Sequence, residues 1–146
     1  MKGKSGEGIA IHLVYRSPNS TKENDGKLCE WMRMLKGQYL VIGDFNFPGV
    51  VWGEGKCDTK SREFLNVVES KFLTQHVTEP THISGNVLDL ILSLAENLVK
   101  EVQMEGRLGG SDHEILVCSV GMPMERKKEK IMIRDFGKAD FIEMRR

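Results

Sequence analysis

The sequence lacks a long apolar run. No stretch approaches the roughly 18 consecutive apolar residues that a membrane-spanning helix needs. Residues 1–8 are rich in Gly and Lys, so they do not form the apolar core of a signal peptide. These absences exclude a helical membrane protein and a secreted one. We therefore expect a soluble intracellular protein, nuclear or cytoplasmic, with no membrane partner.

Cysteine is scarce, and neither positive nor negative residues are in excess. The three cysteines, Cys29, Cys57 and Cys118, lie too far apart for a Cys-x-x-Cys metal pair, so we expect reduced thiols. Lys plus Arg and Asp plus Glu both number 21, so the formal net charge is zero. Any binding of nucleic acid must then depend on a local basic patch. With 40% apolar and 29% charged residues, the composition excludes disorder, collagen and a coiled coil as the dominant class.

Short apolar runs rich in β-branched residues are present, and these are typical of buried strands. They predict strands over residues 9–15, 38–42, 87–93 and 115–120. A shorter strand is predicted at 73–77, and a weaker alternation covers 98–104. Several of these strands are long enough to be buried on both faces of a sheet.

Two helical patterns fall between the strands. Residues 24–26 predict a turn, after which apolar residues at helical spacing over 28–35 predict a helix closed by Gly37. Asp58 or Thr59 is expected to cap a second helix. Its apolar stripe consists of Phe64, Leu65, Val68 and Phe72. Strands that alternate with helices predict an α/β fold.

The length of 146 residues predicts one domain. We expect a flexible start over residues 1–8 and the domain itself over 9–120. From residue 121 the composition changes to a charged run, which predicts a linker and the stub of a following region over 121–146.

Asp89 lies among apolar neighbours in the predicted strand over 87–93. Burial of a lone carboxylate costs several kcal/mol unless it is paired or hydrogen-bonded, so Asp89 needs a partner. A histidine is a natural one, because a carboxylate that accepts from one ring nitrogen fixes the tautomer and raises the basicity of the other. The alternative is a carboxylate at a sheet edge or a satisfied core aspartate.

Asp44 and Asn46 flank Phe45 directly after a predicted buried strand. Strand alternation or a tight turn would put both polar side chains on one side. There a carboxylate and a carboxamide can hold a water molecule and a phosphate oxygen, whereas in an Asx-turn Asp44 would only bind backbone donors. Residues 111–113, Ser-Asp-His, also admit two interpretations. They form a turn or helix N-cap, or they place a carboxylate metal ligand beside a cationic phosphate binder.

The combination of these motifs is more specific than any one of them. Three apolar strands separately deliver Asp, Asn or His to their ends, where one rim could gather them. Carboxylate oxygens without thiolates or clustered histidines suit Mg²⁺ rather than Zn²⁺. Hydrolysis of a phosphodiester needs a metal, a carboxylate that activates water and a donor for the developing charge. The residues cover these roles.

The motifs resemble the endonuclease/exonuclease/phosphatase superfamily. The resemblance is carried, in chain order, by residues 43–46 (Gly-Asp-Phe-Asn), 88–92 (Leu-Asp-Leu-Ile-Leu) and 111–113 (Ser-Asp-His). Residues 14–19, 61–65 and 109–114, with Trp52 after the 43–49 segment, are similar to the endonuclease domain of LINE-type, non-long-terminal-repeat retrotransposons. The segment over 134–141 is similar to the connection to a reverse transcriptase.

The resemblance implies a four-layer α/β sandwich of two packed sheets with helices outside. It also implies nicking of DNA with Mg²⁺ or Mn²⁺ as cofactor, and as a further partner the remainder of a retrotransposon polyprotein. Carried over by motif, Asp44 would activate water or assist the leaving group, and Asn46 would orient Asp44 and the phosphate. Asp112 would help to bind the metal.

The same resemblance assigns roles to four more residues. His113 would stabilise the phosphate transition state, and Asp89 would orient His113. Tyr15 would contact the phosphate or the network of the active site, and Ser111 would be a supporting neighbour.

The family's domain begins with further strands that carry an Asn and a principal metal-binding Glu. Glu7 and Glu23 stand in the wrong sequence contexts to replace that Glu. We therefore expect this chain to correspond to the C-terminal part of the domain, with N-terminal strands missing, exposed strand edges, and weak or absent activity.

Two alternatives stay open. Another phosphoesterase of the superfamily, such as a phosphatase or sphingomyelinase, would share the Asp, Asn and His set. A non-catalytic retrotransposon remnant would instead act as a binding module, using residues 126–130 for nucleic acid or a protein partner.

Overall fold

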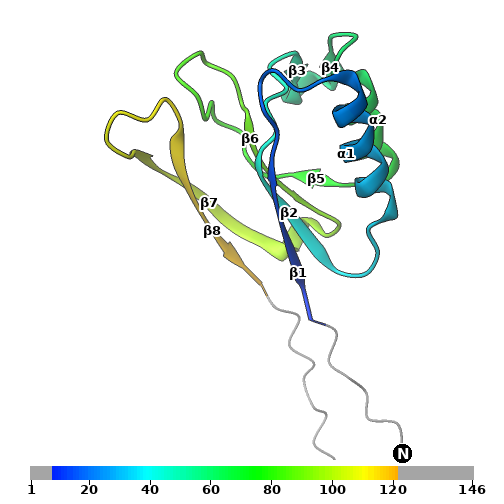
Figure 1. Ribbon diagram of the computed structural model, residues 1–146. Helices are drawn as coiled ribbons and strands as arrows, with labels where there is room; N and C mark the ends of the chain where they lie inside the picture. The colour runs from blue at the N-terminus through cyan, green and yellow to red at the C-terminus, as the bar shows by residue number, and fades with distance from the viewer. Residues whose placement is uncertain (1–7, 122–146) are drawn as a thin grey trace, which may run out of the picture.

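A central sheet lies between two helices and a two-stranded ribbon in the computed structural model, which describes residues 8–121 (Figure 1). The sheet has the strand order β1-β2-β6-β5. Its strands are β1 (Ala10–Tyr15), β2 (Tyr39–Asp44), β5 (Thr74–Gln75) and β6 (Asp89–Ser93). The helices are α1 (Lys22–Met34) and α2 (Arg62–Ser70), and the ribbon pairs β7 (Val99–Arg107) with β8 (Glu114–Val120).

Shorter elements complete the described chain. A small hairpin of β3 (Val50–Val51) and β4 (Lys56–Cys57) encloses the 3-10 turn η1 (Trp52–Glu54), and η2 (Glu96–Leu98) precedes β7. No helix of residues 8–121 is long and apolar enough to cross a membrane. Apart from Gly8 and Gly121, the expected start over 1–8 and the linker over 121–146 lie outside the described residues.

Two hydrophobic cores form on opposite faces of the sheet. Alternate residues of β2 point to opposite sides, so Val41 is buried against the helices and Leu40 against the ribbon. On β6, Leu92 and Ile91 divide in the same way. The expectation of central strands buried on both faces is therefore confirmed for β2 and β6. The α/β class and the packing of two sheets are confirmed as well.

The edge strand β1 departs from expectation, because the sequence predicts that it is buried. Its only sheet neighbour is β2, and the ribbon core includes Ile9 but not the next residues on that face. Leu13 is 81% exposed and Ile11 and Tyr15 are exposed as well. An apolar run alone does not distinguish an edge strand from a central one, since that depends on which strand pairs with it.

Both helices begin at places other than those predicted. The turn expected at 24–26 is wrong, because α1 begins at Lys22, and the Thr21 hydroxyl caps it by accepting from the Asn24 N–H at 3.3 Å. For α2 the cap expected at Asp58 or Thr59 is wrong, since Ser61 precedes the first helical residue. The Asp58 carboxylate instead accepts from the Ser61 N–H at 2.8 Å.

The apolar stripe of α2 is confirmed in part. Phe64, Leu65 and Val68 are buried. Phe72 is 85% exposed, because the helix ends at Ser70 and the backbone then turns into the left-handed region, with φ of +53° at Phe72. The helical spacing therefore no longer applies at that position.

A buried ion pair connects the end of β1 to α1 and to the loop after β2. Arg16, 4% exposed, donates to both carboxylate oxygens of Asp25 at 2.6 and 2.8 Å. It also donates to the Asn46 carbonyl at 2.6 Å, and its guanidinium lies 4.1 Å from the centroid of the Phe47 ring. Such a two-pronged pair fixes geometry as well as charge. It thereby holds the loop that presents Asn46.

We predict that Asp25→Asn lowers the free energy of unfolding by about 3–5 kcal/mol, because it leaves a buried guanidinium without its counter-ion. The hydrogen bond from Arg16 holds the pKa of Asp25 below its ordinary 3.8, so the contribution of the carboxylate is present above that pH and is lost as the pH falls through the lower, folded value. Urea unfolding at several pH values measures both effects. Lys27→Gln, which removes an exposed pair with Glu23, is the control and should change stability little.

Candidate active site

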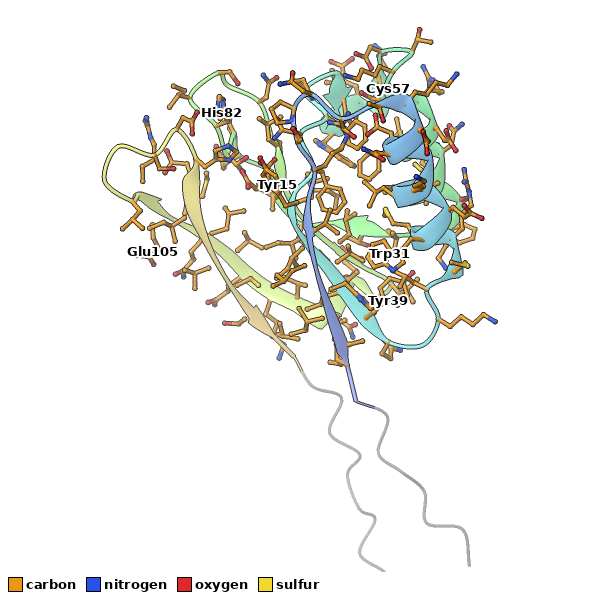
Figure 2. The ribbon with its side chains drawn as sticks, viewed as in Figure 1. Tyr15, Trp31, Tyr39, Cys57, His82 and Glu105 are labelled. Atoms are coloured by element: carbon orange, nitrogen blue, oxygen red, sulfur yellow. The ribbon has the colours of Figure 1, made fainter. Side chains whose placement is uncertain are left out.

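A cleft of about 500 Å³ opens where β2 ends and β6 begins, and the loops around it carry the predicted polar residues. It is lined by Tyr15, Pro18, Asp44, Asn46, His82, Leu88, Asp89, Asp112 and His113. Figure 2 labels Tyr15 and His82 at this end of the molecule. Of the seven predicted site residues, Ser111 alone is absent from this lining, and it lies next to Asp112 in the chain.

The pairing of strands brings two of the carboxylates together. Asp44 is the last residue of β2, and its register partners are Tyr15 on β1 and Asp89 on β6. Asp89 is thus the first residue of β6, so its predicted place in the middle of a strand is wrong. Gly43 precedes Asp44 with φ of +139°, and a Cβ there would collide with the Val14 carbonyl. Only glycine allows this close approach of β1 to β2.

Asp44 and Asn46 form an Asx-turn, as the simpler interpretation predicts. The Asp44 carboxylate accepts from the Asn46 backbone N–H at 3.1 Å and from its side-chain amide at 2.9 Å. Asn46 itself has a φ of +50°, in the left-handed region that asparagine tolerates better than most residues. The turn does not remove Asp44 from the cleft, because Oδ2 of Asp44 lies 3.9 Å from Nε2 of His113. The Asx-turn is therefore confirmed, and the role of the pair in holding water and phosphate stays a prediction.

His113 is the predicted partner of Asp89. Its Nδ1 lies 2.8 Å from Oδ2 of Asp89, and a carboxylate can only accept, so Nδ1 carries the hydrogen. Nε2 then faces the cleft, 3.9 Å from Asp44 and 4.0 Å from Asp112. The Ser111 hydroxyl accepts from the His113 backbone N–H at 3.1 Å and supports this placement.

Thr81 is a site residue that sequence reasoning missed. It is fully buried, and its hydroxyl accepts from the backbone N–H groups of Leu88 and Asp89, both at 3.0 Å. These bonds anchor the start of β6 and with it the Asp89 carboxylate. The only signal in the sequence is a polar residue after Pro80 in a predicted loop, which does not reveal burial.

His82, to which the sequence assigns no role, also enters the cleft. Its Nε2 lies 3.2 Å from Oδ2 of Asp112, and its ring meets that of His113 edge-on with centroids 4.9 Å apart. An isolated antiparallel bridge pairs His82 with His113. The contact joins segments far apart in the chain, so no local pattern could have found it.

Burial and like charge dominate the electrostatics of the cleft. Burial, followed by the charge of Asp89, raises the pKa of Asp44. Partial burial would by itself lower the pKa of His113, but the hydrogen bond to Asp89 and the charges of Asp89, Asp44 and Asp112 outweigh it and raise that pKa above 6.5. The bond from its own backbone N–H, followed by that from His82, lowers the pKa of Asp112.

The side chains converge in two sets that could hold a metal ion. One is Asp44, Asp89 and His113, and the other is His82, Asp112 and His113. Both oxygens of Asp44 accept from Asn46, one oxygen of Asp89 is bound to His113, and Asp112 places its Oδ1 4.0 Å from Nε2 of His113. Glu23 pairs with Lys27 on the surface of α1 and does not line the cleft, and neither does any other glutamate of residues 8–121.

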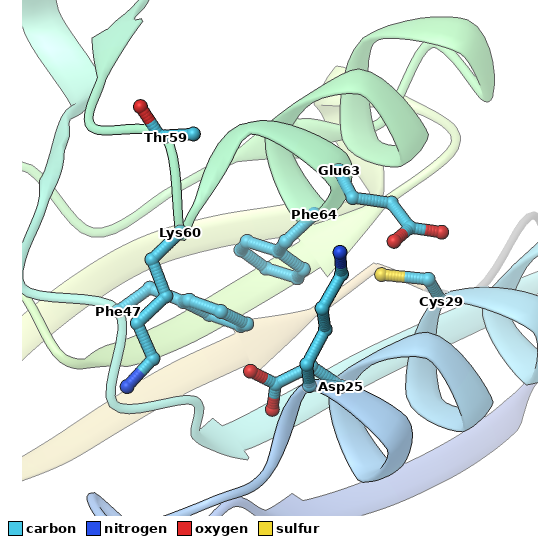
Figure 3. Close-up of a pocket in the computed structure, with 8 residues that line it drawn as sticks. Asp25, Cys29, Phe47, Thr59, Lys60, Glu63 and Phe64 are labelled. Carbon is cyan, nitrogen blue, oxygen red and sulfur yellow. The ribbon is translucent and has the colours of Figure 1, made fainter.

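A second hollow of about 410 Å³ lies between α1 and α2 (Figure 3). Phe47 and Phe64 form its apolar wall, with Lys60 and Glu63 nearby. Burial, followed by the charge of Glu63, raises the pKa of the Cys29 thiol to about 11, so the thiol stays protonated and is a poor nucleophile. Among the described residues, the cleft is therefore the better candidate for chemistry.

We predict that Asp89→Asn lowers the pKa of His113, because the neutral amide removes the strongest of the interactions that raise it. Titration of the His113 ring by NMR in the metal-free protein measures this shift. Because the folded pKa is raised, the ion pair stabilises the fold below pH 6.5 and this contribution is lost as the pH rises through the folded value. Glu105→Gln, on an exposed position of β7, is the control. An unchanged His113 titration in Asp89→Asn would contradict the pairing.

Comparison with solved structures finds a similar fold. The endonuclease domain of TRAS1, a telomere-specific non-LTR retrotransposon, has a similar fold, with a TM-score of 0.56 and 16% sequence identity over 74% of this chain and 54% of that one. The chain therefore spans about half the length of that structure. No curated protein matches the sequence.

The family model described as endonuclease-reverse transcriptase matches residues 9–117. This range holds every predicted site residue, and it confirms the resemblance drawn from the motifs. Since the match extends over most of the 146 residues, the chain belongs to the endonuclease-reverse transcriptase family.

Proposed function

We propose that the chain is a DNA endonuclease, dependent on Mg²⁺ or Mn²⁺, that hydrolyses a phosphodiester in the cleft at the end of β2. The observation that carries the proposal is the placement of His113. Asp89 holds its Nδ1, while its Nε2 faces both Asp44 and Asp112 across an open cleft. Membership of the endonuclease-reverse transcriptase family and the fold shared with the TRAS1 endonuclease domain support a nucleic-acid substrate.

The cleft fits a divalent cation on electrostatic grounds. Asp44, Asp89 and Asp112 bring three carboxylates to it, and the formal net charge of the chain is zero. An anionic phosphodiester would be repelled there unless a cation accompanies it. Mg²⁺ is commonly held by one or two carboxylates together with substrate phosphate, and Asp112, whose Oδ1 lies on the side of His113, would be the ligand here, while Asn46 holds both oxygens of Asp44. The structure also brings His82 and His113 together, so the expectation of no clustered histidines is wrong, and the preference for Mg²⁺ over Zn²⁺ rests on the carboxylates.

When bound, the metal would neutralise phosphate charge and lower the pKa of water. The protein supplies the remaining functions. Asp44, whose pKa is raised, accepts a proton from the attacking water, and the Asn46 amide keeps the Asp44 carboxylate oriented. His113 donates from Nε2 to a phosphate oxygen when protonated, and Asp89 stabilises the imidazolium. Tyr15 stands exposed at the rim, where its hydroxyl can meet a phosphate.

With Asp112 as the carboxylate that would bind the metal, metal affinity in the absence of DNA should be low. We therefore expect weak nicking that needs high metal concentration. We further propose that the chain works with the remainder of a retrotransposon polyprotein and that it meets DNA in the nucleus or cytoplasm.

The test is nicking of supercoiled plasmid by the purified chain with Mg²⁺ or Mn²⁺, with EDTA as the negative control. We predict that Asp44→Asn and His113→Ala each reduce the nicking rate by about 10²–10⁴-fold, the range for loss of an acid–base or charge-stabilising group. Glu105→Gln should leave the rate unchanged, since this exposed carboxylate lies on β7 outside the cleft.

Three outcomes would speak against the proposal. Nicking that persists in EDTA or in His113→Ala would point to a contaminating nuclease. Hydrolysis of small phosphomonoesters without nicking would favour another phosphoesterase of the superfamily. A folded chain that binds DNA but never cleaves it, at any metal concentration, would favour the non-catalytic binding module.

A further inference from the structure

We propose that His82 is a positioning residue, whose Nε2–H holds the Asp112 carboxylate so that its second oxygen faces the cleft. The inference rests on the proposed function, because it gives Asp112 a purpose only if that carboxylate binds the metal. His82 contributes through Asp112 and is not assigned a contact with DNA.

The tautomer of His82 follows from its hydrogen bonds. The backbone N–H of Ser84 donates to Nδ1 at 3.1 Å, and the Ser84 hydroxyl lies 2.7 Å from the same atom. A backbone N–H cannot accept, so Nδ1 presents its lone pair. In the neutral ring the hydrogen is then on Nε2, which lies 3.2 Å from Oδ2 of Asp112. His82 is therefore a donor to Asp112.

The backbone fixes the distance between the two side chains. The Ile83 N–H donates to the Asp112 carbonyl at 3.0 Å, and the Glu114 N–H donates to the Thr81 carbonyl at 2.8 Å. These bonds surround the bridge between His82 and His113. The loop that carries His82 thus pairs with the segment that carries Asp112 and His113.

This contact gives an exposed carboxylate a defined orientation. The Asp112 side chain is 59% exposed and would otherwise sample several rotamers. His82 binds Oδ2, which leaves Oδ1 on the side of His113, 4.0 Å from Nε2. Partners that orient a metal-binding side chain typically contribute 10–100-fold in metal affinity.

The same hydrogen bonds argue against His82 as a direct metal ligand. Nε2 is the atom of His82 that lies 3.2 Å from Asp112, and it would need a lone pair in order to bind a metal. Its lone pair is absent as long as Ser84 donates to Nδ1. The ring therefore acts on the carboxylate and not on the metal.

The experiment measures Mn²⁺ binding to the purified full chain, without DNA, by electron paramagnetic resonance. His82→Phe keeps a ring against His113 but loses the N–H, and we expect it to weaken Mn²⁺ binding about 10–100-fold. His82→Gln keeps an N–H donor without the ring and should recover most of the affinity. Asp112→Asn should lose binding more severely than either, and Glu105→Gln should match the wild type.

Long-range ¹H–¹⁵N NMR of the histidine rings in the wild-type protein is the second readout. At mildly alkaline pH it should show His82 with its hydrogen on Nε2. This measurement needs no variant, so it decides the tautomer even where His82→Phe fails to fold.

The outcomes separate the two proposals. Wild-type Mn²⁺ affinity in His82→Phe, equal weakening in His82→Phe and His82→Gln, or a hydrogen on Nδ1 of His82 would each overturn the role of His82. Wild-type affinity in Asp112→Asn would instead overturn the metal site on which the proposed function depends.

Discussion

The register between β2 and β6 is the constraint on which the site depends. It makes Asp44 and Asp89 cross-strand partners, so two carboxylates meet at the end of a sheet where burial raises the pKa of Asp44. Like charges opposite each other destabilise a strand pair unless a cation lies between them. His113, which directly precedes β8, supplies that charge when it is protonated, with Nδ1 2.8 Å from Asp89. The site thus joins the sheet to the ribbon through electrostatics as well as through the apolar core between them.

The groups around Asp44, Asp89 and His113 act mainly by restricting the conformations of these side chains. The Thr81 hydroxyl anchors the start of β6, and Asn46 holds the Asp44 carboxylate. Arg16, which is buried and paired with Asp25, donates a hydrogen bond to the Asn46 carbonyl. Preorganised polar groups of this kind need no reorganisation when charge develops in a transition state. The buried ion pair therefore serves the geometry of the cleft although it lies outside the chemistry.

Sequence patterns predicted the class of the fold and most of its strands, but they failed where tertiary neighbours decide. The apolar run of β1 predicts burial, yet Leu13 is 81% exposed because β1 is an edge strand that the ribbon leaves uncovered. At 24–26 the local turn signal is overridden by the Thr21 cap, which starts α1 earlier. Phe72 has helical spacing but follows the last turn of α2. Boundaries and edges depend on contacts that a short window of sequence does not contain.

For the site, the sequence by itself determined the chemical inventory. The position of Asp89 in an apolar run predicted a hydrogen-bonding or charged partner for its carboxylate. Carboxylates without nearby thiols indicated a hard cation. Tertiary structure alone decided which groups meet. It turned the Asx-turn at Asp44 toward His113, and it brought in Thr81 and His82 through a bridge between distant loops. The physical reason is that the residue type decides whether a side chain can donate or accept a hydrogen bond or change its charge. Strand register and sheet packing decide which of these side chains lie close enough to interact.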